Sequence, residues 1–325
     1  MYAAQVTSQN AEDPLAGLTI TQDAPERAGH VPSDWVRVAV QSSSLNHHDL
    51  WSLRGVGLPA DRLPMTLGTD AAGVTDDGQE VIVHSVISDP GWRGDETLDP
   101  SRTLLSEKYP GTIADFVWVP AQNLVAKPKE LSWPAAACLS TAYLTAYRML
   151  FTAGALRPGD SVLIQGAGGG VATAATALAR AAGLRVYVTS RSEEKRGRAL
   201  EIGAHEALPT GERVPQQVDA VLETVGEATW SHSLRSVKPG GKIVVAGATT
   251  GQSPDPELNR VFFRSVQVVG TTMGTRSELE SLIDFLLATG VRPEIDYVES
   301  FFDPVPAFER LMSGAAFGKV VLFAC

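Results

Sequence analysis

The sequence contains little cysteine and no long apolar run, and both shortages narrow the class of protein. Its two cysteines, Cys138 and Cys325, cannot build a disulfide framework or a cysteine-rich zinc cluster. No segment approaches the roughly 18–20 uninterrupted apolar residues that a membrane-spanning helix needs. The first residues lack a basic segment followed by an apolar core, so we expect no secretory signal. These absences predict a cytoplasmic protein without a membrane partner.

Positive charge is also scarce. The chain has 27 Lys and Arg residues against 37 Asp and Glu residues, which gives a formal net charge of −10. Without a basic stripe to offset phosphate charge, we expect no nucleic-acid partner. Any phosphate-bearing ligand must therefore be bound by locally placed cations. The 325 residues, 44% of them hydrophobic, are enough for two domains with a core each.

Residues 161–190 are the most informative stretch. An apolar run, Val162 to Ile164, is followed by a glycine cluster, an alanine-rich segment with helical periodicity, and a second apolar run over residues 184–189. This order predicts a strand–turn–helix–strand unit whose turn binds the pyrophosphate of a dinucleotide. Read from Ala167 the pattern is A-x-G-x-x-A, with Ala172 where glycine is more usual. The predicted cofactor-binding residues of this turn are Gly166, Ala167, Gly168, Gly169, Gly170 and Val171.

The end of the second strand predicts which dinucleotide is preferred. An acidic residue there would bind the ribose 2′-OH of NAD, but Ser190 and Arg191 follow the strand, with Lys195 one helical turn later. A hydroxyl and two cations suit a 2′-phosphate and favour NADPH. Two alternatives stay open. Ser190 and Glu193 could form a capping box with the cations in solvent, or Glu193 or Glu194 could reach a ribose hydroxyl.

The pattern of elements changes along the chain. Residues 1–130 contain short β-rich runs separated by polar and Gly/Pro-rich stretches, and the tail from residue 292 resembles them. Between them, strands alternate with helical segments, which indicates a parallel sheet covered on both faces. We therefore predict an α/β protein. A β domain of residues 1–130 with 292–325 would accompany a doubly wound parallel sheet domain of residues 131–291.

Several motifs together resemble the medium-chain dehydrogenase/reductase superfamily. They are LNHHDLW (45–51), GTDAAG (68–73), GTIADFVWVP (111–120), LTAYRML (144–150), RPGDSVLIQGAGGGVA (157–172), KPGGKIVVAG (238–247) and FGKVVL (317–322). The resemblance implies a GroES-like β domain, to which the C-terminal strand returns, and a Rossmann domain. It also implies an active site in the cleft between the two domains.

The resemblance breaks at the metal ligands. Zinc-containing members have Cys, His and Cys where this chain has Asn46, Thr69 and Thr141, and Cys138 lies three residues too early. The four-cysteine zinc loop is replaced by residues 88–110. The chain therefore resembles zinc-free quinone reductases and zinc-type alcohol dehydrogenase-like proteins, and we expect no metal. A different site, formed by His47 and His48 with Asp70 or His84, is disfavoured because adjacent helical residues point in different directions.

The resemblance also implies roles for single residues. Asn46 would lie beside the nicotinamide, while Thr145 and Lys195 would contact the cofactor. His48 falls where zinc-containing relatives have a proton-relay hydroxyl, so it is the leading candidate for the proton donor, with Asn46 and water as the alternatives. A simpler interpretation is that Asn46 caps a short helix. Residues after later strands should border the nicotinamide, namely Ala246, Gly247, Ala248, Thr271 and Met273. Trp51 and Tyr109 are candidate substrate walls.

The expected reaction is hydride transfer from NADPH to a quinone, an enone or a similar conjugated carbonyl. A zinc-free alcohol or aldehyde oxidoreductase, a non-catalytic NADPH-binding sensor and a metal-dependent alcohol dehydrogenase with unusual ligands are the alternatives. Relatives often dimerise by pairing the last Rossmann strand, here residues 266–271, so we expect a homodimer. The apolar character of this strand would equally suit the interior of a sheet.

Overall fold

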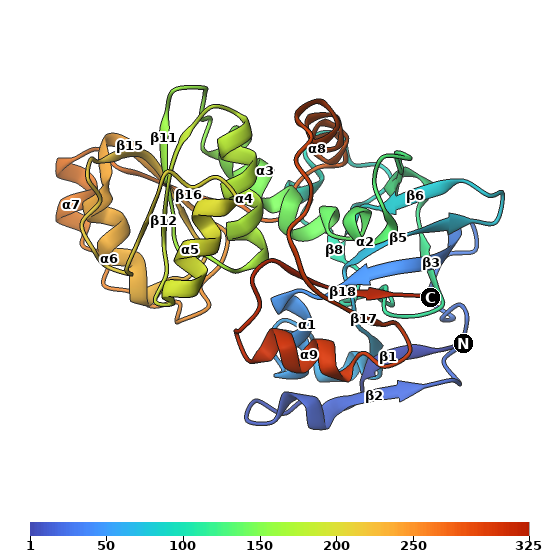
Figure 1. Cartoon of the computed structure of the whole chain (residues 1–325). Coiled ribbons are helices and arrows are strands. Elements are labelled where there is room, and N and C mark those ends of the chain that lie inside the picture. Colours follow the sequence, from blue (N-terminus) through green and yellow to red (C-terminus); the bar gives the residue numbers. More distant parts are fainter. Residues whose placement is uncertain (325) are drawn as a thin grey trace. The chain divides into compact units, whose positions relative to one another are not determined.

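A computed structural model describes residues 1–324 of the chain (Figure 1). Its strands are β1 (Ala3–Val6), β2 (Leu18–Thr21), β3 (Val36–Ser44), β4 (Met65–Thr66), β5 (Asp70–Thr75), β6 (Glu80–Val83), β7 (Val86–Ile87), β8 (Thr103–Leu104), β9 (Phe116–Val119), β10 (Leu124–Ala126), β11 (Ser161–Ile164), β12 (Arg185–Thr189), β13 (Glu206–Leu208), β14 (Val218–Glu223), β15 (Val237–Val245), β16 (Gln267–Gly270), β17 (Ile295–Ser300) and β18 (Lys319–Phe323). Its α-helices are α1 (His47–Leu53), α2 (Trp133–Ala136), α3 (Leu144–Tyr147), α4 (Gly170–Ala181), α5 (Glu193–Glu201), α6 (Glu227–Ser236), α7 (Leu258–Phe263), α8 (Arg276–Thr289) and α9 (Val305–Met312).

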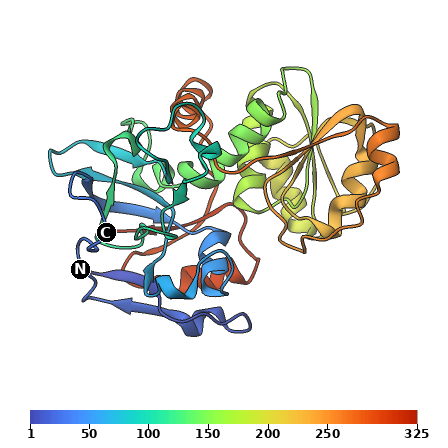
Figure 2. The same cartoon turned by 180° about the vertical axis from the view of Figure 1, so that it is seen from behind.

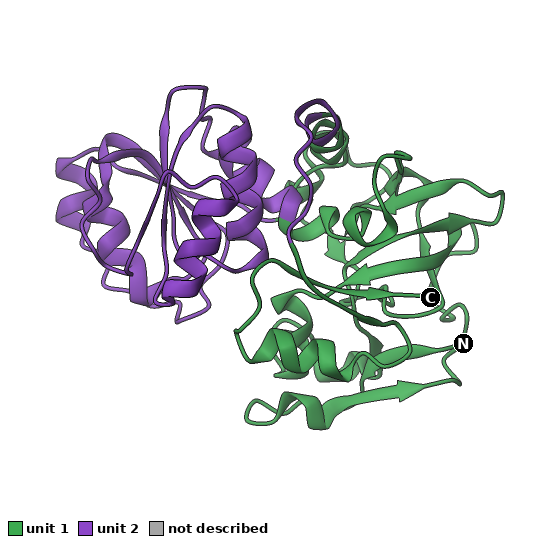
Figure 3. Ribbon diagram, viewed as in Figure 1, with its two compact units in different colours: residues 1–142, 273–284, 295–325 green, residues 143–272, 285–294 purple. Residues whose placement is uncertain are grey.

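The chain forms two compact units, which Figure 3 colours separately. Unit 1 contains residues 1–142, 273–284 and 295–325, and unit 2 contains residues 143–272 and 285–294. The domain boundaries predicted at residues 130/131 and 291/292 stay predictions, since a compact unit and a domain need not end at the same residue. Cys325 lies outside the described residues.

Unit 2 contains the parallel sheet that the alternating pattern predicts. Its strands pair in the order β13-β12-β11-β14-β15-β16, and every pairing is parallel. Strand β11 is buried at each position, as a central strand covered on both faces must be. In chain order the arrangement is 3-2-1-4-5-6, which is that of the dinucleotide-binding Rossmann fold. From β11 the chain adds strands toward one edge of the sheet, and from β14 it adds them toward the other edge. In a sheet of this kind a ligand binds at the carboxyl ends of the two strands where the direction changes, here β11 and β14.

Unit 1 is a β structure to which the tail of the chain returns. Strand β18 pairs antiparallel with β3, with Val321 opposite Ser44, and parallel with β17. Helix α9 lies beside α1 in both views of the chain (Figures 1 and 2). The predicted return of the C-terminal strand to the first domain is confirmed.

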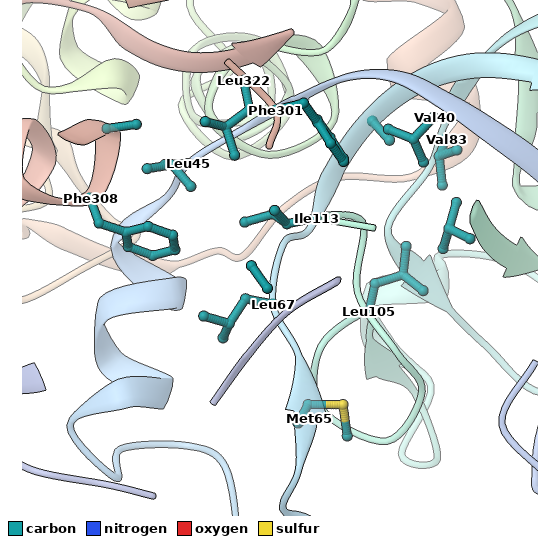
Figure 4. Packing of buried hydrophobic residues seen from close by; sticks show 14 of the residues in the cluster. Val40, Leu45, Met65, Leu67, Val83, Leu105, Ile113, Phe301, Phe308 and Leu322 are labelled. Carbon is teal, nitrogen blue, oxygen red and sulfur yellow. The ribbon is translucent and has the colours of Figure 1, made fainter. Parts of the chain in front are cut away.

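One apolar core holds the elements of unit 1 together (Figure 4). Leu45, Leu67 and Leu322 come from separate parts of the chain and are each no more than 2% exposed. Phe308 of α9 packs into the same cluster. The core thereby fixes the start of α1 and the segment before β5, which carry the polar residues of the candidate site. No helix within residues 1–324 has the length and apolar content to cross a membrane.

Candidate active site

The glycine turn after β11 has the backbone that a phosphate cradle needs. Gly166 and Gly168 have φ values of +76° and +110°, a region that favours glycine. A Cβ at Gly168 would lie 2.6 Å from Cδ of Lys195, so any larger residue would displace that side chain. The first N–H groups of α4 have no partner within their own helix and suit a pyrophosphate. This turn and the start of α4 contain the predicted residues Gly166, Ala167, Gly168, Gly169, Gly170 and Val171.

Ser190, Arg191 and Lys195 follow β12, but the cap of the next helix differs from the prediction. Ser192 is the N-cap residue of α5, and its Oγ accepts a hydrogen bond from the Lys195 backbone N (3.2 Å). The predicted capping box of Ser190 and Glu193 is therefore wrong, because the helix begins later than expected. Ser190 Oγ instead accepts from the backbone N of Ser192 (3.2 Å). The cap uses the backbone N of Lys195 and not the side chain of Arg191 or Lys195. The Arg191 side chain is exposed.

A cation that sequence reasoning missed fixes this loop. Arg196 donates from Nη1 to the carbonyl oxygen of Ser190 at 2.9 Å. The guanidinium therefore ties the start of α5 to the residue at the end of β12. In the sequence, the position of Arg196 directly after Lys195 was the one indication that it could contact this loop.

A buried polar network lies at the switch point of the sheet. Glu223, the last residue of β14, is fully buried, and its carboxylate accepts from the backbone N of Val225 (2.8 Å) and Gly226 (3.0 Å) and from hydroxyls of α6. These hydroxyls are Thr229 Oγ1 (2.9 Å) and Ser233 Oγ (2.6 Å). All the donors are neutral, so hydrogen bonds alone offset the loss of water.

Gln165 connects this network to β12. Its Nε2 donates to Ser233 Oγ (3.0 Å), and its Oε1 accepts from Thr189 Oγ1 (2.5 Å). These hydrogen bonds connect the carboxyl ends of β11, β12 and β14 through side chains. Gln165 directly precedes Gly166, so the network adjoins the predicted phosphate-binding turn. Sequence reasoning missed Gln165 and Glu223, although a polar residue directly after a buried apolar run was a usable signal.

The remaining predicted cofactor residues are spread over two units. Ala246, Gly247 and Ala248 follow β15, and Thr271 follows β16, so they lie at the carboxyl edge of the same sheet. Thr271 Oγ1 accepts a hydrogen bond from Nε of the buried Arg148 (3.1 Å). Thr145 lies in α3 of unit 2, whereas Met273 belongs to unit 1.

In unit 1 a buried lysine binds Asn46, one of the residues that replace zinc ligands, and the carboxylate of Asp70. Lys319 of β18 is 2% exposed, and its Nζ donates to Asn46 Oδ1 (2.7 Å), the Leu45 carbonyl oxygen (2.8 Å) and Asp70 Oδ2 (3.2 Å). Asn46 Nδ2 donates to Asp70 Oδ2 (2.8 Å) and to Thr69 Oγ1 (3.2 Å). The amide of Asn46 is thus held on both sides by groups of its own unit.

These residues do not fit a zinc ion. Zinc in proteins is bound by thiolate, imidazole or carboxylate ligands, and Thr69 and Thr141 offer only hydroxyls, which bind each other at 3.0 Å. The Lys319 ammonium already binds Asn46 Oδ1 and would repel a second cation there. Within residues 1–324, no three His, Cys, Asp or Glu side chains converge on a common point. His84, a residue of the alternative metal site, binds the Gly274 carbonyl oxygen through Nε2 (2.9 Å).

The local fold around Asn46 explains how helix α1 starts. Asn46 is the N-cap residue, as the simpler interpretation expects, and Asp49 completes a capping box: its Oδ2 accepts from the Asn46 backbone N (2.8 Å). Its Oδ1 accepts from the Gly68 backbone N (2.9 Å) and so ties the helix to the segment before β5. Burial raises the pKa of Asp49, although nearby positive charge and these hydrogen bonds act in the opposite direction.

His48, the predicted proton donor, is paired with a carboxylate. Its Nε2 lies 3.3 Å from Glu107 Oε1, and its Nδ1 is buried without a hydrogen-bond partner among the described residues. Burial lowers the pKa of His48, but the hydrogen bond with Glu107 and the charge of Asp49 outweigh it and raise the pKa above its usual value. Burial also lowers the pKa of His47, where no such partner compensates. Sequence reasoning missed Glu107, which lies in a loop with no periodic pattern.

The two predicted substrate walls lie in different surroundings. Trp51 is on α1, partly exposed, with its ring 6.4 Å from that of His47. Tyr109 packs against Trp35 at 4.5 Å and stacks on His30 at 5.8 Å between ring centroids. Tyr109 therefore has a structural role within unit 1, and its contact with a substrate stays a prediction.

Comparisons with known proteins agree with this architecture. Residues 32–129 match the family model described as alcohol dehydrogenase GroES-like domain, and residues 170–288 match the one described as zinc-binding dehydrogenase. A crotonyl-CoA carboxylase/reductase of Cereibacter sphaeroides is 30% identical over 77% of this chain and 70% of its own length. A quinone oxidoreductase of Lama guanicoe is 28% identical over 88% of each chain. The crystal structure of an NAD-dependent alcohol dehydrogenase superposes over both whole chains with a TM-score of 0.90 and 30% identity.

The two matched regions, the Rossmann strand order and the returning C-terminal strand define the class. The chain belongs to the medium-chain dehydrogenase/reductase superfamily of oxidoreductases. The predicted family, the GroES-like β structure and the Rossmann sheet are confirmed. Its similar proteins carry the names of different reductases and dehydrogenases, so similarity alone leaves the substrate open.

Proposed function

We propose that the protein is a zinc-independent, NADPH-dependent reductase of a quinone, an enone or a similar conjugated carbonyl. The observation that carries zinc independence is the Lys319 ammonium, which binds Asn46, where zinc-containing relatives have a cysteine ligand, and the carboxylate of Asp70. The names of the two relatives above support the substrate class, because quinones and crotonyl groups both place a C=C bond next to a carbonyl.

The glycine turn and the end of β12 support a nicotinamide dinucleotide as cofactor, and NADPH above NADH. Arg191 is exposed at the end of β12, and Lys195 lies against Gly168, so both are near the predicted pyrophosphate turn. Each charge-assisted contact with a 2′-phosphate contributes about 1.5–3 kcal/mol, which corresponds to tenfold or more in affinity. The turn would hold the pyrophosphate and the two cations the 2′-phosphate. When bound, NADPH supplies a hydride to the electrophilic carbon.

The residues of unit 1 would stabilise the negative charge that hydride transfer creates and would supply the proton. Hydride addition to a conjugated carbonyl makes an enolate, which needs hydrogen-bond donors and then a proton. His48, whose side chain is partly exposed and paired with Glu107, would give that proton. Asn46 would keep its place beside the nicotinamide, with an orientation fixed by Lys319 and Asp70.

We also propose a homodimer formed through β16. This strand is at the edge of its sheet among the described residues, with one row of backbone groups unpaired. Large apolar side chains nearby are exposed: Val268 on β16 is 48% exposed, and Phe262 and Phe263 on α7 are 60% and 80% exposed. A monomer by analytical ultracentrifugation, or a dimer unaffected by Val268→Lys, would rule this interface out. The cytoplasmic location stays a prediction from the cysteine content.

The function is tested by following nicotinamide oxidation with NADPH and with NADH, against a quinone, an enone and an unconjugated aldehyde. We expect turnover of the conjugated acceptors with NADPH preferred. Turnover of the aldehyde alone would favour the alcohol or aldehyde oxidoreductase, which the likeness to an NAD-dependent alcohol dehydrogenase keeps in view. NADPH binding without turnover of any acceptor would favour a non-catalytic sensor.

A further inference from the structure

The contact between His48 and Glu107 joins two parts of unit 1 that are far apart in the sequence. His48 is on α1 and is 19% exposed, while Glu107 lies in the turn after β8 and is 27% exposed. Glu107 Oε1 binds Nε2 of the imidazole ring at 3.3 Å. The second ring nitrogen, Nδ1, is buried without a partner among the described residues.

The turn holds the Glu107 carboxylate in a set position. Glu107 Oε2 accepts from the backbone N of Leu104 (3.0 Å) and from Thr103 Oγ1 (3.3 Å). The Glu107 carbonyl oxygen accepts from Arg62 Nη1 (3.1 Å). A carboxylate with one oxygen bound to its own turn can offer only the other to His48. The pair is therefore built into the turn and is unlike the mobile ion pairs of a protein surface.

The charges around His48 favour its protonated form. Glu107 from the turn and Asp49 from the same helix are the carboxylates that raise its pKa. The pKa of the adjacent His47 is lowered. From α9, which packs against α1, Arg310 binds Asp296 and Glu309 is exposed. Arg62 is a nearby cation, and its Nη1 binds the Glu107 carbonyl oxygen. The 3₁₀ turn at residues 14–17, which also contacts α1, has no charged residue.

We propose that Glu107 is a positioning residue that binds Nε2–H of His48 and holds the imidazolium as the proton donor of the reaction. The proposal rests on the proposed reduction and deepens it. The substrate gains a hydride from NADPH at its electrophilic carbon and a proton from the His48 imidazolium at the enolate. The products are the saturated carbonyl or hydroquinone, NADP⁺ and neutral His48, which regains its proton from water. Glu107 keeps its charge throughout and takes no proton.

The first test is an NMR titration of the His48 ring in the unaltered protein and in three variants, with assignment from a His48→Gln variant. Glu107→Gln keeps the shape of the side chain but removes its charge and one of its two acceptor oxygens. We expect the His48 pKa to fall by about one unit or more, the size that an opposite charge at this distance produces. Glu107→Asp keeps the charge and should restore part of the shift. Glu80→Gln is the matched control, because Glu80 binds Lys127 in the same unit, away from His48.

The second test is the pH dependence of NADPH oxidation with the best acceptor. Protonated His48 is the donor, so the rate should fall as pH rises through the His48 pKa, and Glu107→Gln should move this limb to lower pH by the same amount. An unchanged His48 titration in Glu107→Gln, or a shifted titration with an unmoved rate profile, overturns the proposal. Absence of turnover in the unaltered protein instead contradicts the proposed function, while the titration still decides whether Glu107 sets the His48 pKa.

Discussion

The two units of the chain bury a carboxylate in opposite ways. In unit 1, Asp70 lies beside a buried cation, Lys319, at 3.2 Å, and it also accepts from Ser44 and Asn46. In unit 2, Glu223 is equally buried, but within residues 1–324 its carboxylate is bound by neutral hydroxyls and backbone N–H groups and by no cation. The first arrangement requires two charges to stay together, whereas the second spreads one charge over many dipoles. The two should therefore respond very differently to the loss of a single group.

The largest effect should follow from removing the cation of unit 1. Lys319→Met would leave Asp70 as a buried charge without its counter-ion and should lower the free energy of unfolding by about 3–5 kcal/mol. Urea denaturation followed by circular dichroism measures this change. Lys319→Met combined with Asp70→Asn removes both charges and should regain most of the loss. A single variant within about 1 kcal/mol of the unaltered protein would show that the pair is not coupled.

Removing the charge of Glu223 should have a smaller effect. Glu223→Gln replaces an acceptor oxygen by an NH₂ group, so a donor such as Ser233 Oγ loses its partner. We expect the free energy of unfolding to fall by about 1–3 kcal/mol. The same denaturation experiment measures it, with Glu206→Gln on the partly exposed edge strand β13 as the control. A loss as large as that of Lys319→Met would mean that neutral dipoles and a counter-ion are equivalent here.

The cations of the two candidate sites also differ in burial. Arg191 of unit 2 is exposed, whereas Lys319 of unit 1 is buried. Arg191→Ala should weaken NADPH binding about tenfold or more, leave NADH binding almost unchanged, and alter stability by less than about 0.5 kcal/mol. Fluorescence titration with both cofactors measures the ratio. Arg213→Ala, at another exposed position of unit 2, is the control. Equal losses for NADPH and NADH would remove the assignment of Arg191 to a 2′-phosphate.

Much of the fold could be predicted because it follows from periodic patterns. The alternation of buried strands with helices predicted the parallel sheet of unit 2, and the glycine cluster marked the turn after β11. The pairing of β18 with β3 followed the resemblance of the tail to the first third of the chain. The helix cap after β12 could not be predicted, since Ser190 and Ser192 both precede acidic residues and only the backbone decides between them.

The polar partners of the site were harder to predict, for a physical reason. Lys319 stands in an apolar strand, and the sequence does not state which distant groups its ammonium meets. Glu107 and His48 are 59 positions apart, and the turn that joins them has no repeating pattern. Asn46 and His48 were found because motifs of the family mark their positions. Pairings of this kind depend on tertiary packing, which local sequence patterns do not encode.

The measurement that tests the central claim most directly is the zinc content of the purified protein, determined together with its NADPH-dependent reduction of a quinone before and after treatment with a chelator. The account predicts that zinc is far below one ion per chain and that the rate is the same after chelation. Lys319 binds Asn46 at one ligand position, and Thr69 and Thr141 offer only hydroxyls at the other two. One zinc ion per chain, with activity that chelation removes and added zinc restores, would contradict it.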